Sequence, residues 1–319
     1  MSAQETLRAP FPWFGGKSRA APLVWAALGD VSNYVEPFAG SLAVLLARPH
    51  APRVETVNDA DCYVANFWRA LAAEPSEVAR LADWPVNEAD LHARHAWLVG
   101  RVEFRERMKI DPDFYDAKVA AWWAWGISQW IGSGWCDLKR NGASASHRKR
   151  PIVGGWRIGC GVHQGERTSG HASLAGWFNA LRDRLRSVRV CCGDWSRVVK
   201  PTVLTTSGVT GVMLDPPYSH DERDPDLYAS EDENVAAAAR EWAIAHGDDP
   251  ALRIVLCGYD GEHAMPKGWR AVEWKATGGY GNQRKNGVNE NAARERLWLS
   301  PFCVEQPPKQ RSLFEEVSR

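Results

Sequence analysis

Carboxylates follow four short apolar segments of this sequence, each of which reads as a buried strand. Glu36, Asp59 and Asp194 stand at the ends of three of them, and Asp215 closes the segment GVMLD and begins the run DPPY. Prolines lack the N–H of a sheet ladder and fix φ, so the strand must stop at Asp215. Ligands of open α/β sheets bind at such strand ends. The pattern therefore predicts an acceptor-rich pocket, with a simple strand-terminating turn as the alternative for Asp215.

A nucleoside offers the donors that such a pocket would bind, namely two ribose hydroxyls and an amino group. The phosphate-binding pattern G-x-G-x-x-G of dinucleotide folds is missing, because EPFAGSLA (36–43) holds one glycine where three are needed. We therefore expect a ribose and a base without a pyrophosphate, which S-adenosylmethionine satisfies. Asp59 and Asp194 have a second interpretation, as caps of the helices that follow them.

The elements that must position these residues alternate between strands and helices. Strands are expected at 34–36 and 54–59, with helices before, between and after them and a break at Pro75. Residues 85–118 read as helical and charged, whereas 122–177 show little periodicity. The second half predicts helices at 173–187 and 234–247, strands at 188–194, 211–215 and 252–259, and an antiparallel pair from 268–276 and 293–301. This order predicts an α/β fold with a doubly wound sheet.

The composition is that of a globular chain with reduced cysteines. The chain has 319 residues, no net charge and seven cysteines, none of which form a C-x-x-C pair. No apolar run reaches the roughly 18–20 residues of a membrane span, and the first residues hold no signal-peptide pattern. We therefore expect a cytoplasmic protein that does not contact membranes. His92 and His95 lie at helical spacing without a third ligand nearby, so we interpret them as surface histidines and expect no metal.

Residues 138–189 form a basic zone, although the whole chain has no net charge. It holds eleven Lys and Arg against two acids, Glu166 and Asp183. Such an excess points to a polyanionic partner on one face, and a solvated surface is the alternative. Many of the 17 tryptophans lie between Trp122 and Trp177. We expect most of them in the core and some free to stack on bases.

Six motifs in a fixed order resemble the Dam-type DNA adenine methyltransferases, the alpha group of the D12 class. They are WFGGK (13–17), VEPFAGS (35–41), ND (58–59), CGDW (192–195), LDPPY (214–218) and RLWLSP (296–301). The resemblance implies a Rossmann-like class I S-adenosylmethionine-dependent methyltransferase sheet with an inserted, mostly helical or irregular DNA-recognition region. The implied boundaries are 1–75 and 188–303 for the two parts of the methyltransferase domain, 76–187 for the insert and 304–319 for a flexible tail.

The resemblance also implies roles for the residues at matching positions. The implied cofactor-binding residues are Trp13, Gly15, Gly16, Lys17, Glu36, Pro37, Phe38, Gly40, Asp59, Asp194 and Asp215. Among them, Lys17 would meet the methionine carboxylate, Asp59 the ribose, and Asp194 would lie near the cofactor's adenine. The chain departs from the family at Leu42, where a glycine is usual, and this departure predicts a helix that begins one residue early.

The implied reaction transfers a methyl group from S-adenosylmethionine to the exocyclic N6 amine of a flipped-out adenine in double-stranded DNA, as in restriction–modification. The implied catalytic residues are Asp215, Pro216, Pro217 and Tyr218. Asp215 and the Pro216 carbonyl would each accept one N–H of the amine, and Tyr218 would stack on the base. Phosphate contacts are expected from Lys139, Arg140, Arg148, Lys149, Arg150 and Arg157. The alternatives are a cytosine-N4 or RNA methyltransferase, and a catalytically impaired DNA-binding remnant.

The segment QRSLFEE (310–316) is similar to the short peptides that bind bacterial sliding clamps. Gln310, Leu313 and Phe314 stand at the matching places. A tail without a partner is the alternative. We further expect a monomer or weak dimer, encoded by a bacterium or by a phage in a bacterial host.

Overall fold

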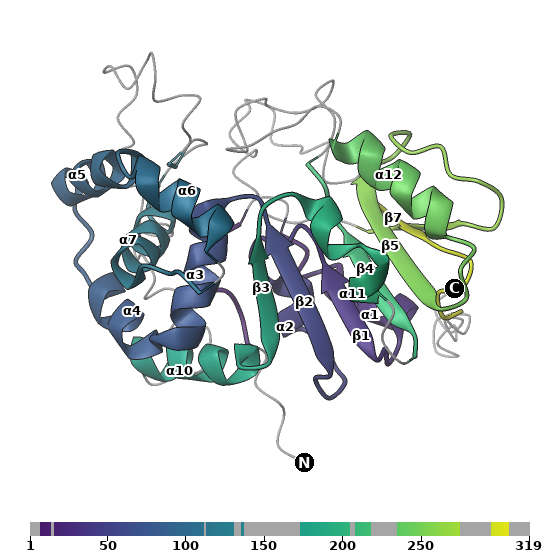
Figure 1. Ribbon diagram of the computed structural model, residues 1–319, viewed down its shortest axis with the longest axis horizontal. Coiled ribbons are helices and arrows are strands. Elements are labelled where there is room, and N and C mark those ends of the chain that lie inside the picture. The colour runs from purple at the N-terminus through teal and green to yellow at the C-terminus, as the bar shows by residue number, and fades with distance from the viewer. Residues whose placement is uncertain are drawn as a thin grey trace, which may run out of the picture.

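Within the part of the chain that the structure describes, seven strands form one sheet in the order β3-β2-β1-β4-β5-β7-β6 (Figure 1). The computed structural model describes residues 7–13, 16–111, 113–130, 135–136, 173–204, 208–217, 235–274 and 295–305. The strands are β1 (Asn33–Glu36), β2 (Val54–Asp59), β3 (Val188–Cys192), β4 (Thr210–Leu214), β5 (Leu252–Tyr259), β6 (Arg270–Glu273) and β7 (Glu295–Leu299). β1 to β5 run parallel to one another, whereas β7 is antiparallel to both β5 and β6. This mixed α/β sheet confirms the predicted Rossmann-like fold and its closing antiparallel pair.

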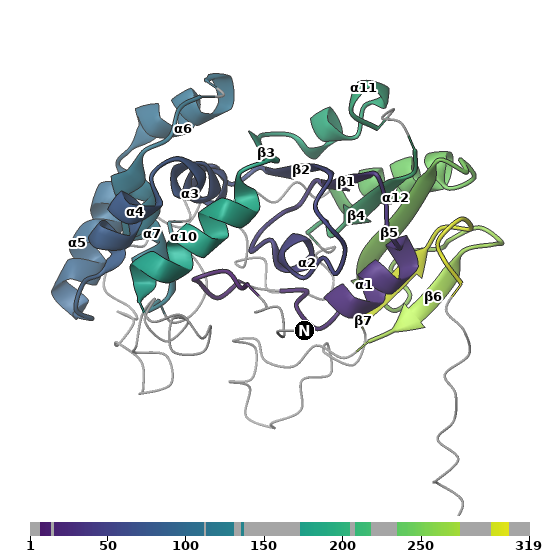
Figure 2. The ribbon, with the colours of Figure 1, turned by 90° about the horizontal axis from the view of Figure 1, so that it is seen from below.

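The central strands contribute to two hydrophobic cores, because successive side chains of a strand point to opposite faces. Val212 and Leu214 face one core and Met213 the other. The first core is covered by η1 (Trp195–Val198), α11 (Pro201–Leu204) and α12 (Val235–His246). The second is covered by α1 (Ala21–Leu28), α2 (Ala43–Leu46) and α3 (Cys62–Ala73). Figure 2 shows α1 and α2 on the opposite side of the sheet from α11 and α12.

A long helical connection joins β2 to β3. After α3 its described residues form α4 (Pro75–Ala82), α5 (Glu88–Val99), α6 (Val102–Ile110), α7 (Ala117–Ile127) and α10 (Leu174–Leu185). The expected loss of periodicity from residue 122 is wrong for the end of α7. This helix packs against α3, α4 and α5 and buries Trp123 and Trp125, and a helix covered on several sides has no polar stripe. None of the described helices is long and apolar enough to cross a membrane.

The strand order reverses direction between β1 and β4. From β1 the chain proceeds outward to β2 and β3, and it then returns to β4 on the other side of β1. Loops that leave the carboxyl ends of these two strands therefore diverge, one toward each half of the sheet. In open α/β sheets this divergence is where ligands bind.

Candidate active site

Two acids flank the point where the strand order reverses. Glu36 is the last residue of β1, and Asp215 follows directly after β4, which is hydrogen-bonded to β1 with Val35 opposite Val212. Lys17, just before α1, joins them, since its Nζ lies 2.9 Å from Oδ1 of Asp215. The structure thus brings together residues from the first, second and fifth of the six motifs.

Lys17 is a buried cation with two carboxylate neighbours. The residue is 4% exposed. Besides Asp215 it has Oε2 of Glu295 at 4.0 Å and the Trp274 ring centroid at 5.6 Å. Burial opposes the charge, but the fields of Asp215 and Glu295 outweigh it and hold the pKa of Lys17 above its ordinary value. The ammonium is therefore charged at any physiological pH.

Glu36 is the other acid at these strand ends, and it is 4% exposed. Burial raises the pKa of Glu36 to about 8, and the nearby Asp215 adds to the rise. The Tyr34 hydroxyl donates a hydrogen bond to Oε2 of Glu36 at 3.0 Å, which favours the charged form without reversing the effect of burial. At neutral pH the Glu36 carboxyl is therefore mostly protonated and can donate a hydrogen bond.

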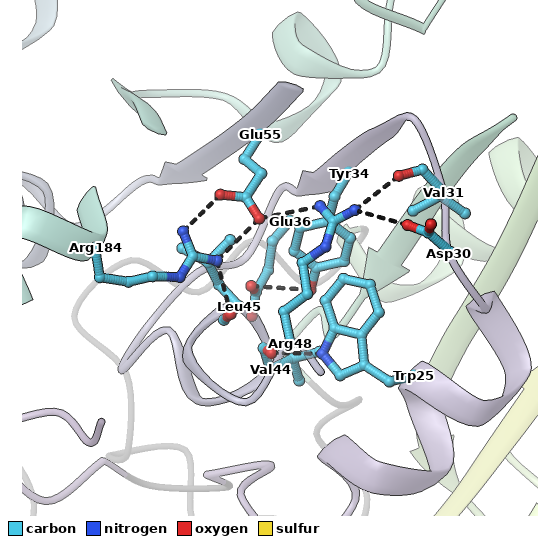
Figure 3. A network of polar contacts seen from close by, with 10 residues as sticks. All are labelled: Trp25, Asp30, Val31, Tyr34, Glu36, Val44, Leu45, Arg48, Glu55 and Arg184. Carbon is cyan, nitrogen blue, oxygen red and sulfur yellow. Dashed lines mark hydrogen bonds and ion pairs between the residues drawn. The ribbon is translucent and has the colours of Figure 1, made fainter. Parts of the chain in front are cut away.

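A buried network of ion pairs and hydrogen bonds lies next to Glu36 (Figure 3). Its centre is Glu55 of β2, which has no exposed surface and accepts hydrogen bonds from Arg48 at 3.0 Å and from Arg184 at 2.6 and 2.9 Å. The same two arginines donate to backbone carbonyls, Arg48 to that of Val31 and Arg184 to that of Leu45. The network ties β2, α2 and α10 together and thereby fixes the loop that follows β1.

Gly40 in that loop is held by three contacts. Its N–H donates to Oδ2 of Asp59 at 2.8 Å and its carbonyl accepts from the Trp68 indole at 2.9 Å. Its φ is +46°, and a Cβ built on it would lie 2.3 Å from the Trp13 indole nitrogen. Trp13 therefore packs on the loop backbone, and its ring also lies 6.2 Å from the centroid of Phe11. Only glycine satisfies both the positive φ and the close approach of the indole.

Leu42 takes the conformation expected of a glycine. Its φ of 55° and ψ of 25° are left-handed, and it caps α2, which begins at Ala43. The expectation that the helix begins one residue early is therefore wrong. Leu42 has no exposed surface, so the free energy of burying its side chain offsets the roughly 1–2 kcal/mol of left-handed strain.

Asp59, at the end of β2, orders the backbone around it. Its carboxylate accepts from the N–H groups of Gly40 and Asp61, each at 2.8 Å. Burial and the charge of Asp61 raise the pKa of Asp59 to about 7, and the backbone hydrogen bonds limit the rise. The alternative that Asp59 caps the next helix is wrong, because Asp61 is the N-cap of α3 and accepts from the N–H of Tyr63.

Asp194, after β3, has the helix-capping role. Its exposed carboxylate accepts from the N–H of Ser196 at 2.9 Å and caps η1. The side chain of Asn58 joins the neighbouring strand ends, donating to the carbonyls of Pro37 at 3.0 Å and Gly193 at 2.9 Å. Beside them Phe38 stacks on Trp195, with ring centroids 5.7 Å apart.

Sequence reasoning missed Glu295 and the ion network around Glu55. The available signal for Glu295 was its spacing, because it lies two and four residues before the buried Leu297 and Leu299 and therefore on the same face of the strand. His95, which the sequence predicts on the surface, is half-buried, and its ring centroid lies 5.0 Å from that of Trp130.

Several predicted residues lie outside the described part of the chain. They are Gly15, Tyr218, Lys139, Arg140, Arg148, Lys149, Arg150, Arg157, Gln310, Leu313 and Phe314. Their roles stay predictions.

Comparison with known families supports part of the resemblance. Residues 13–109 match the model of the D12 class N6 adenine-specific DNA methyltransferase family. The matched region includes Lys17, Glu36 and Asp59, whereas Asp194, Asp215 and Glu295 lie beyond it. No curated protein matches the chain. The match favours DNA adenine methylation in general and leaves the Dam-type group a prediction.

Proposed function

We propose that this protein transfers a methyl group from S-adenosylmethionine to the N6 amine of a flipped-out adenine in double-stranded DNA, as the Dam-type enzymes do. The observation that carries the proposal is the position of Asp215. It stands at the carboxyl end of β4 where the strand order reverses, 2.9 Å from Lys17, and directly before Pro216 and Pro217. The D12 match of residues 13–109 supports the same reaction.

The donors and acceptors at the strand ends suit S-adenosylmethionine. Asp59, whose pKa is about 7, would accept hydrogen bonds from the ribose hydroxyls, and Lys17 would attract the methionine carboxylate. Asp194, with Phe38 and Trp195 nearby, would lie at the adenine end. When bound, the cofactor supplies an electrophilic methyl group on a positively charged sulfur. The Asp215 carboxylate at the same strand ends is compatible with that charge.

Asp215 and Pro216 would activate the target amine. The amine lone pair is delocalised into the adenine ring, so the nitrogen is a poor nucleophile until its hydrogens are bound by acceptors. The Asp215 carboxylate accepts one N–H and the Pro216 carbonyl accepts the other, which turns the lone pair toward the methyl group. The two prolines restrict the backbone and keep both acceptors in place before the base arrives.

DNA binding is proposed for the segment 76–187, the connection between the two parts of the methyltransferase domain (1–75 and 188–303). Its basic residues 139, 140, 148, 149, 150 and 157 would contact phosphates, which position the duplex without reading its sequence. Extruding the base costs a few kcal/mol, and contacts to Tyr218 would offset part of it. The motif with Gln310, Leu313 and Phe314 would bind a sliding clamp, and we place the protein in the cytoplasm of a bacterial cell.

The proposal is tested by incubating the protein with unmethylated DNA and S-adenosylmethionine and sequencing for modified bases. We expect N6-methyladenine, and Asp215→Ala should lower its formation by at least about 100-fold, as for other preorganised groups that contact the reacting atoms. Asp248→Ala, an exposed acid after α12, is the matched control and should keep full activity. Modified cytosine or modified RNA would establish one of the rival reactions. Binding of DNA without any cofactor binding would establish an inactive remnant.

A further inference from the structure

The two carboxylates beside Lys17 differ in how firmly they are held. The Asp215 side chain is 23% exposed and directly follows β4, whereas the Glu295 side chain is 7% exposed. Glu295 is the first residue of β7 and pairs with Tyr259 of β5. Its carbonyl also accepts a hydrogen bond from the N–H of Trp274 at 3.4 Å. Glu295 is therefore part of the sheet, and Asp215 stands at the open side of the pair.

The proposed reaction changes the contacts of Lys17. When the Asp215 carboxylate accepts an N–H from the target amine, it gives up part of its contact with Lys17. Lys17 is 4% exposed, so its ammonium is largely shielded from water. A buried ammonium without a counter-charge is strongly unfavourable. The Glu295 carboxylate, whose Oε2 lies 4.0 Å from Nζ, offers a counter-charge that can stay in place during this change.

We propose that Glu295 stays paired with Lys17 throughout the reaction and holds the ammonium in place while Asp215 turns to bind the target amine. This inference rests on the proposed function. Glu295 is a positioning residue, because it acts through Lys17 and touches no reacting atom. Because Glu295 stays beside Lys17, Asp215 is available to the base, and Lys17 keeps a counter-charge whether or not the methionine carboxylate is bound.

The kinetic test replaces Glu295 by residues that separate charge from shape. Glu295→Gln keeps the shape and removes the charge. We expect its single-turnover rate, at saturating cofactor and DNA, to fall at least about tenfold, and by more than its cofactor affinity changes. Glu295→Asp keeps the charge and should retain most of the rate. Glu273→Gln removes an exposed acid from the neighbouring β6 and should have no effect.

A second measurement uses the protein without cofactor or DNA. Urea unfolding of the wild type, Glu295→Gln, Lys17→Met and the double variant forms a double-mutant cycle. We expect Glu295→Gln to lower the folding equilibrium constant at least about tenfold in the wild-type background and much less in the Lys17→Met background. This result would show that Glu295 acts on Lys17, whatever the reaction.

The outcomes separate this inference from the proposed function. A Glu295→Gln protein with wild-type rate, a Glu295→Asp protein as slow as Glu295→Gln, or a cycle without coupling to Lys17 would each overturn the inference. An inactive wild type would instead refute the proposed function, and the role of Glu295 in it. That case is recognised because the wild type and the Glu273→Gln control then fail alike.

Discussion

Replacing Glu36 by Gln should change how the stability of the fold depends on pH. The unfolded chain ionises Glu36 near pH 4.5, whereas burial holds the pKa of the folded carboxyl at about 8. Between these values the folded state keeps a proton that the unfolded state has released. The free energy of unfolding therefore falls as pH rises from about 4.5 to about 8, and it is level outside that window.

The magnitude follows from the two pKa values. Each pH unit inside the window lowers the free energy of unfolding by about 1.4 kcal/mol, so the wild type loses about 2 kcal/mol from this group between pH 6 and pH 8. Gln cannot ionise and still fills the space beside Tyr34. The Glu36→Gln protein should therefore gain about 2 kcal/mol relative to the wild type over the same interval.

Urea denaturation of both proteins at pH 6, 7 and 8, followed by tryptophan fluorescence, measures this difference. Other titrating groups, Asp59 among them, are common to both proteins and cancel in the comparison. Two parallel stability curves would show that Glu36 has an ordinary pKa and would refute the argument from burial. A difference of opposite sign would mean that Glu36 is charged and paired in the fold.

Three further variants test the supports of the site by urea unfolding. Gly40→Ala puts a methyl group on the Trp13 indole at a φ of +46° and should cost about 2–4 kcal/mol; wild-type stability would mean that the loop can move away. Leu42→Gly relieves about 1–2 kcal/mol of backbone strain but removes a buried side chain that stabilises the fold by more than that. We therefore expect its free energy of unfolding to fall by about 1–4 kcal/mol. A variant more stable than the wild type would contradict this expectation. Glu55→Gln removes the carboxylate that pairs with the buried Arg48 and the partly buried Arg184 and should cost about 3–5 kcal/mol, whereas Glu103→Gln, at an exposed position, should not.

The sheet could be predicted from the sequence because each strand carries its own local signals. The predicted β2 has the same bounds as the observed one, Val54–Asp59, because three β-branched residues lie within it and Asn58 and Asp59 end it. The prolines after Asp215 likewise fixed the end of β4. Helix α7 was harder to predict, because several helices cover it and its sequence therefore lacks the amphipathic period.

The contacts across the site could not be predicted in the same way. The pairing of Lys17 with Asp215 depends on the path of the chain before α1, and nothing local to either residue specifies it. Glu295 reaches Lys17 because β7 lies antiparallel beside β5, a long-range choice of register. Leu42 misled the sequence reasoning for a related reason. Backbone preference is a local property, whereas the burial that overrides it is set by the whole core.

Four acids at one sheet edge would repel one another if all were buried and charged, and the protein treats each differently. Glu36 keeps its proton, Asp59 accepts two backbone N–H groups, Asp194 lies exposed on a helix cap, and Asp215 pairs with Lys17. Their chemical abilities differ accordingly. A protonated Glu36 can donate a hydrogen bond, whereas the Asp215 side chain already contacts the Lys17 ammonium at 2.9 Å. The sequence therefore predicts an acid-rich pocket, but only the packing around each carboxyl decides which of them can bind the hydrogens of an amine.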